Sequence, residues 1–284
     1  MRLKTLLWAI VFFVLPGAAM AQDNKETLIK KLYGKSGMEK QIEQMPMLMQ
    51  VVFEQAVASD DRLKAMPRSV IDEARSSIKT VFASENIKNT ILGECRETLS
   101  HDDLKKVLYW LESPIGRQFT QLEEVASTPE KYIEMQQFAS QLQKSPPEPE
   151  RVKILQQLDS AVKATETSVE VAMNTQLAVA IAITASLPKE QQPTYDKLVA
   201  AIEQNRPQIE NAARIQTLVF ALYTYGGVTY ADLGQYIAFA SSPAGTNYHN
   251  AIISGLKKAL LEGAFKWGES IADSIKQSAG KTDT

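Results

Sequence analysis

The sequence of 284 residues contains a single cysteine, Cys95, and only two histidines, His101 and His249. One cysteine excludes an internal disulfide, so the stability of the chain must come from packing. The few histidines stand at no metal-ligand spacing, and we expect neither a metal site nor a cofactor. A catalytic thiol needs a histidine partner, which is not visible near Cys95, so we expect this residue to be a small buried hydrophobe.

The sequence also has no excess of basic residues, because 31 lysines and arginines are balanced by 33 aspartates and glutamates. This composition gives no electrostatic footprint for nucleic acid and no basic block for anionic lipid. Gly-x-Ser-x-Gly elbows and phosphate-binding loops are missing as well. We therefore predict no catalytic residues and no enzyme, and we interpret the pair Glu123-Glu124 as solvated charge. An envelope hydrolase is the weakest alternative, since carboxylates that converge only in space leave no pattern in the sequence.

The N-terminal apolar run is too short to span a bilayer. It extends from Leu6 to Leu15, follows Arg2 and Lys4, and precedes the small-x-small sequence Ala19-Met20-Ala21. This pattern predicts a signal peptide at residues 1–21, cleaved after Ala21. We expect an exported, periplasmic protein of a Gram-negative bacterium with no integral membrane span after cleavage; an uncleaved anchor is the alternative.

Strand signals are almost absent, whereas apolar residues recur at spacings of three and four nearly everywhere. The pattern predicts an all-α fold. Ser100 and Asp103 form a capping box at the start of one helix, and Pro46 is expected to kink or restart another. The main expected helices cover residues 39–57, 67–82, 85–99, 100–112, 129–143, 169–187 and 250–276.

One segment occurs twice, because residues 99–119 align without a gap to residues 228–248. The two copies share an N-cap residue, an aromatic residue, a Ser-Pro-x-Gly corner and a second aromatic residue, which indicates a tandem duplication. The predicted architecture is two tandem multi-helix repeats, at 22–144 and 151–278, packed about a pseudo-two-fold axis. A stiff proline-rich spacer is expected at 145–150 and a disordered tail at 279–284.

The Ser-Pro-x-Gly corner has a steric explanation. The residue before proline is disfavoured in the α region, so the incoming helix ends at the serine, and proline suits the first position of the outgoing helix. The serine can cap this helix, and the glycine lets another segment approach closely. We expect the two flanking aromatic residues to pack across each bend as a clamp. The corner residues are Trp110, Ser113, Pro114, Gly116 and Phe119 in the first copy, and Phe239, Ser242, Pro243, Gly245 and Tyr248 in the second.

Exposed amides at such a helix start can also bind an anion, with help from Arg117. The second copy has Thr246 at the equivalent position. This difference weakens any ligand common to both copies, so we prefer the structural role of the corner.

The aromatic residue, the Ser-Pro-x-Gly corner and the early Leu-x-x-x-x-Gly helix together resemble the bacterial domain-of-unknown-function family catalogued as 2059. The similarity is best at residues 100–119 and extends over 27–143. The second repeat has Lys163 near the position of Gly37, and Leu111 and Ala240 stand where the family commonly has an aromatic residue. The resemblance implies an exported helical domain, and it implies nothing about an activity.

A methionine-rich segment, Met45, Met47 and Met49, is the predicted interaction surface, since flexible thioether side chains suit adaptable partners. We expect a protein-interaction module of the cell envelope whose partner is an envelope protein. The alternative is a binder of an apolar small molecule or lipid between the helical repeats. The apolar stripe of residues 250–276 is expected to pack on its own domain, with binding to a membrane surface as the alternative.

Overall fold

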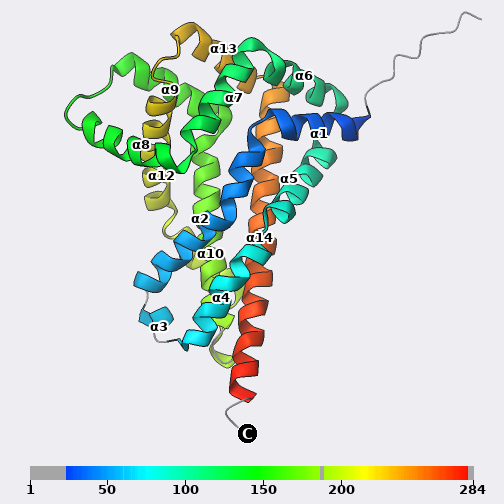
Figure 1. The fold of residues 1–284 in the computed structure, drawn as a ribbon, viewed down its shortest axis with the longest axis vertical. Coiled ribbons are helices and arrows are strands. Elements are labelled where there is room, and N and C mark those ends of the chain that lie inside the picture. The colour runs from blue at the N-terminus through cyan, green and yellow to red at the C-terminus, as the bar shows by residue number, and fades with distance from the viewer. Residues whose placement is uncertain (1–23, 60, 65, 186–188, 281–284) are drawn as a thin grey trace, which may run out of the picture.

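The computed structural model describes residues 24–59, 61–64, 66–185 and 189–280, and over these residues the protein is all-α, with no strand (Figure 1). The predicted signal peptide lies outside the described residues, and so does the end of the predicted tail. Among the described helices, none combines the length and hydropathy that crossing a bilayer requires.

Within the described residues, eight helices precede the proline-rich spacer. Pro46 lies inside the second of them, so this helix passes the proline without restarting. A capping box starts α6, where Ser100 Oγ accepts from the Asp103 amide and the Asp103 carboxylate accepts from the Ser100 amide. The eight helices are α1 (Lys25–Lys35), α2 (Met38–Ser59), α3 (Asp61–Lys64), α4 (Arg68–Val81), α5 (Ser84–Thr98), α6 (His101–Glu112), α7 (Pro114–Ala126) and α8 (Pro129–Leu142).

The spacer is shorter than predicted, because Pro149 already occupies the first turn of the next helix. The last helix is longer than predicted: it begins at Pro243 and continues through Gly280, past the expected start of the tail. The remaining elements are α9 (Pro149–Val162), α10 (Ala164–Ala185), the short 3-10 helix η1 (Lys189–Gln191), α11 (Tyr195–Glu203), α12 (Arg206–Thr224), α13 (Tyr230–Ala240) and α14 (Pro243–Gly280).

The largest core combines helices from both predicted repeats, and Trp267 of α14 lies at its centre. This side chain is fully buried, and its ring meets Phe53 and Phe82 edge-on, at centroid distances of 5.2 and 6.0 Å. Its indole Nε1 donates to the carbonyl oxygen of Ala74 at 2.9 Å, so the one polar atom of the ring is paired. The C-terminal helix therefore contributes to the core of the first half.

Helix α10 is the central element of the fold. It contacts α2, α9, α11, α12 and α14, and it runs beside α14 through the middle of the molecule (Figure 1). Small residues such as Ala178, which is fully buried, allow this close packing. The predicted two-fold axis that would relate the halves stays a prediction.

Candidate functional site

The structure places both Ser-Pro-x-Gly segments at sharp helix–helix corners. Ser113 is the C-cap of α6 and the N-cap of α7: its Oγ accepts from the Gly116 amide at 2.9 Å and donates to the Trp110 carbonyl at 2.7 Å. Because Ser113 already binds this amide, and Arg117 is exposed beyond it, the corner offers little to an anion. A Cβ at Gly116 would overlap the Trp110 carbonyl oxygen, so the glycine is required.

The second corner repeats these contacts between α13 and α14. Ser242 Oγ accepts from the Gly245 amide at 3.1 Å and donates to the Phe239 carbonyl at 2.6 Å. A Cβ at Gly245 would overlap the same carbonyl oxygen. Pro243 takes the first position of α14, as Pro114 does in α7.

The tertiary fold brings the two corners against each other. Trp110 stacks on Phe239 at 4.8 Å with an interplanar angle of 9°, and it lies 6.4 Å from Phe119 across its own bend. The other aromatic residue of the second corner, Tyr248, is buried in the large core and contacts the ring of His249 at 5.1 Å. Phe239 thus stacks on the equivalent residue of the first copy, Trp110, and not on Tyr248, its predicted partner across the bend.

Glu123 of α7 turns its carboxylate inward, which corrects the interpretation of this residue as solvated charge. Its Oε1 accepts from the Tyr225 hydroxyl at 2.7 Å and from the Tyr236 hydroxyl at 3.1 Å. Burial raises the pKa of Glu123 above its ordinary value, and the two hydrogen bonds oppose this effect. Burial and the nearby carboxylate raise the pKa of both tyrosines, so they remain protonated donors. Its neighbour Glu124 forms an ion pair with Lys40 at 2.6 Å.

Two residues that could carry chemistry are held neutral. Cys95 is fully buried, and burial raises the pKa of its thiol to about 12, so it is no nucleophile at neutral pH. Burial, with the charge of Lys163, lowers the pKa of His249 to about 4. Its Nε2 finds no hydrogen-bond partner among the described residues. Within the same residues, no group of three His, Cys, Asp or Glu side chains is arranged to hold a metal ion.

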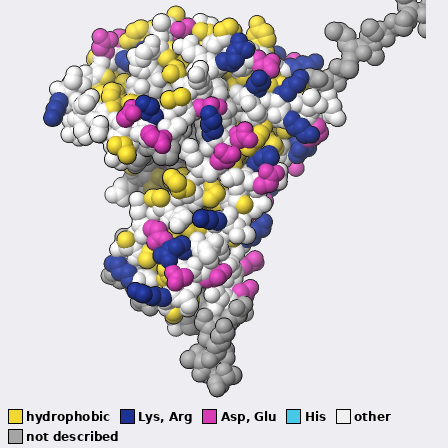
Figure 2. All heavy atoms as spheres, viewed as in Figure 1, with side chains coloured by type: hydrophobic (Ala, Val, Ile, Leu, Met, Phe, Trp, Pro, Cys, Tyr) yellow, Lys and Arg dark blue, Asp and Glu magenta, His cyan; other side chains and the backbone are white. Residues whose placement is uncertain are grey.

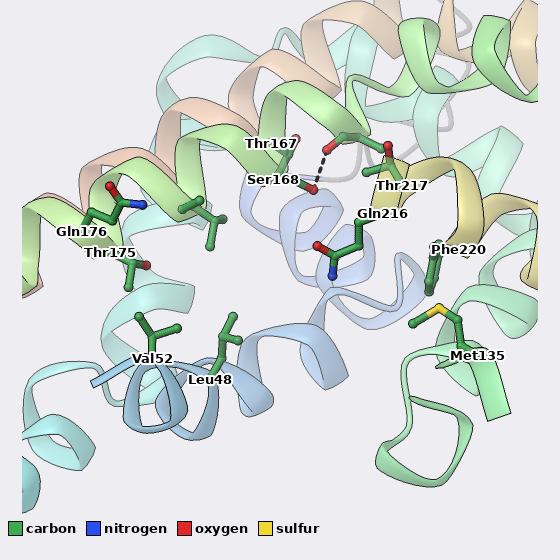
Figure 3. Close-up of a pocket in the computed structure, with 13 residues that line it drawn as sticks. Leu48, Val52, Met135, Thr167, Ser168, Thr175, Gln176, Gln216, Thr217 and Phe220 are labelled. Carbon is green, nitrogen blue, oxygen red and sulfur yellow. Dashed lines mark hydrogen bonds between the residues drawn. The ribbon is translucent and has the colours of Figure 1, made fainter. Parts of the chain in front are cut away.

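A groove of about 680 Å³ opens between the two halves. Figure 2 shows the molecule hollowed on its left side, below the lobe that contains α8 and α12, with hydrophobic side chains at the hollow. All of the residues that line the groove are uncharged. Figure 3 shows how four helices contribute to it: Leu48 and Val52 from α2, Met135 from α8, Thr175 from α10, and Gln216 and Phe220 from α12.

Of the three methionines of the predicted interaction surface, Met47 points away from the other two. Met47 is 58% exposed, Met45 packs partly against the core, and Met49 is buried at 2% exposure, where its sulfur accepts from Thr175 Oγ1 at 3.5 Å. Residues two apart on an α-helix project about 200° from each other, so these three cannot form one face. Met49 therefore does not belong to an exposed surface, and an interaction role for Met45 and Met47 stays a prediction.

The large exposed hydrophobic side chains of α2 are Met47, Leu48 and Val51, which we call the α2 ridge. Leu48 is 42% exposed and Val51 is 45% exposed. Leu48 also lines the groove, whereas Met47 and Val51 line a shallow depression outside it. Spacing of four along the helix, from Met47 to Val51 and from Leu48 to Val52, is the signal that could have found these residues.

Comparisons of this chain with protein-family models, with curated proteins and with solved structures find no match.

Proposed function

We propose that this chain is an exported, non-catalytic interaction module of the cell envelope, which binds a partner protein through the α2 ridge and the adjoining groove. The observation that carries the proposal is the exposure of Met47, Leu48 and Val51 side by side on one helix. Contiguous exposed apolar surface next to polar surface is typical of protein–protein interaction sites. Placement in the envelope rests on the signal-peptide pattern of residues 1–21, and membership of the family catalogued as 2059 is part of the same proposal.

The uncharged lining of the groove limits the kind of partner surface that can bind there. Because the lining residues of the groove are uncharged, a charged side chain placed there would lose its hydration without gaining an ion pair. Gln176 and Gln216 are exposed in the groove and still offer amide groups that can fix orientation. The partner surface is therefore apolar, with a few uncharged polar groups.

A second candidate is an apolar small molecule or lipid in the same groove. The volume of about 680 Å³ favours it, since small-molecule pockets commonly measure about 300–1,000 Å³. A ligand confined to the groove would leave Met47 and Val51 exposed, because they lie outside it. A protein partner would cover the ridge and the groove together, and we prefer it for that reason.

The test compares three tagged proteins: the wild type, a Met47→Asp/Val51→Asp variant, and a Tyr109→Asp control, whose residue is 82% exposed on α6. Each is used to isolate partners from periplasmic extract, with quantitative mass spectrometry. We expect a partner that the wild type and the control retain equally and that the ridge variant loses at least tenfold. The same set of partners from all three proteins would contradict the proposal. A small molecule seen by native mass spectrometry on all three would favour the second candidate.

A further inference from the structure

The order and contacts of the helices correspond between the two halves. α2 and α10 both have 22 residues, and their bounds differ by a constant 126 positions. α2 contacts α1, α4 and α5, and α10 contacts α9, α11 and α12. Each half then reaches its corner, where α6 gives way to α7 and α13 gives way to α14. In this correspondence α10 is the counterpart of α2, α12 of α5, and α14 of α7.

In the second half, α14 packs between α10 and α5. The fit is close on both sides: a Cβ at Gly255 would lie 2.7 Å from the Cα of Ile91 in α5, and a Cβ at Gly268 would lie 2.6 Å from Ile181 in α10. Ala259 and Ala264, on the same helix, are also buried. A face of small and apolar residues thus allows α14 to pack closely against both α10 and α5.

Because α10 corresponds to α2 and α5 corresponds to α12, the equivalent position in the first half is the space between α2 and α12. α7 starts towards it, because Glu124 pairs with Lys40 near the start of α2. The helix ends at Ala126, however, and Pro129 starts α8 in a new direction.

α8 is then fixed on α12. Phe138 meets the Tyr223 ring at 5.6 Å, and the Tyr223 hydroxyl donates to Glu134 at 2.6 Å. The groove is lined by Leu48 and Val52 of α2 and by Gln216 and Phe220 of α12, so it lies between the two helices that correspond to α10 and α5 (Figure 3).

We infer that the groove receives an α-helix of the partner, which lies along α2 against α12 as α14 lies along α10 against α5. This inference rests on the proposed function and adds that the partner segment bound in the groove is helical. The helix is amphipathic: its inner face carries small and apolar residues without charge, to match the uncharged lining, and its charged residues face solvent. An amphipathic helix laid into an apolar groove is a recurring mode of peptide recognition, read through anchors three, four and seven residues apart.

The experiment introduces the photo-crosslinking residue p-benzoylphenylalanine into the full-length protein, at Leu48, Val52 or Gln216 in turn. Leu48 and Gln216 are exposed, so the larger side chain there does not disturb the core. Tyr109 on α6 is the control position. After irradiation of cells that produce these variants, mass spectrometry identifies which residues of the partner are linked to each position.

We expect links to one segment of the partner, at residues three, four and seven apart. Sites linked from Leu48 and from Val52 should differ by about one helical turn, because these positions are themselves one turn apart. Tyr109 should give no link to that segment. Linked residues that lie two apart in the partner sequence, or that show no regular spacing, would contradict a helical partner segment. The proposed function would then still stand. Adducts of a small molecule alone, or no adduct at any groove position, would overturn both.

Discussion

Lys163 and Gly37 adopt the same left-handed backbone conformation at corresponding points of the chain, with φ values of 59° and 70°. Each residue directly precedes a 22-residue helix, Lys163 before α10 and Gly37 before α2. A glycine accepts positive φ without strain, whereas a lysine does not. The second half therefore makes the same turn with a residue that is strained in this conformation.

Lys163→Gly is expected to stabilise the protein by about 1 kcal/mol, since it removes left-handed strain from a residue with a Cβ. Chemical denaturation with urea measures the change as a higher midpoint. Lys163→Ala is the matched control, because it also removes the ion pair of Lys163 with Glu166 but keeps the strained Cβ. If the alanine variant gained as much stability as the glycine variant, the strain explanation would be wrong.

Gly116→Ala and Gly245→Ala are each expected to destabilise the protein by about 1–3 kcal/mol, because the new Cβ meets a backbone carbonyl oxygen at the corner. Thermal unfolding followed by circular dichroism gives the measurement. Gly234→Ala is the control: this glycine lies within α13, and a Cβ there would meet no heavy atom within 4 Å. Alanine at this position should leave stability unchanged or raise it by up to about 1 kcal/mol. Equal losses in all three variants would contradict the assigned role of the corners.

His249 should make the protein less stable as the pH falls. Its pKa is lowered from 6.5 to about 4 in the folded state, so the unfolded chain binds more protons between these two values. The stability contributed by the neutral ring is complete above pH 6.5 and decreases as the pH falls towards 4, by roughly 3 kcal/mol in total. The measurement is the free energy of unfolding of the wild type and of His249→Leu at several pH values. The difference between the two proteins should change across this window; a constant difference would contradict the prediction.

Glu123 should produce the opposite dependence. Its pKa is raised above 4.5 in the folded state, so the folded protein binds more protons than the unfolded chain from pH 4.5 up to the folded pKa. The stability that the protonated carboxyl contributes is therefore present at low pH and is lost as the pH rises. Glu123→Gln keeps an oxygen that accepts from Tyr225 and Tyr236, and it should gain stability relative to the wild type as the pH rises through this range.

Glu123→Leu separates the hydrogen bonds from the charge. It leaves the hydroxyls of Tyr225 and Tyr236 buried without their acceptor, at a cost of about 1–3 kcal/mol for each unpaired group. The loss should be smaller in a background where both tyrosines are phenylalanine. Additive effects in this mutant cycle, measured by urea denaturation, would show that the three side chains do not act together.

The sequence by itself determined the all-α fold and those helix ends that a cap or a proline defines, such as the start of α6 at Ser100 and the corner at Ser113. These features depend on short-range sterics and hydrogen bonds: the spacing of apolar residues, the capping box of Ser100 and Asp103, and the conformation that Pro114 imposes on Ser113. Each can be evaluated from residues a few positions apart, without knowledge of the rest of the chain.

Only the tertiary structure decided which faces of these helices are covered. It placed Trp267 in the core of the first half, turned Glu123 towards two tyrosines of the second half, and buried Met49 while leaving Met47 and Leu48 exposed. These outcomes depend on contacts between residues far apart in the sequence, such as Trp267 and Ala74, which are separated by 193 positions. Helical periodicity defines an apolar stripe, but the neighbour that covers it is set by how all the helices pack together, and the groove beside α2 is where that packing leaves a stripe uncovered.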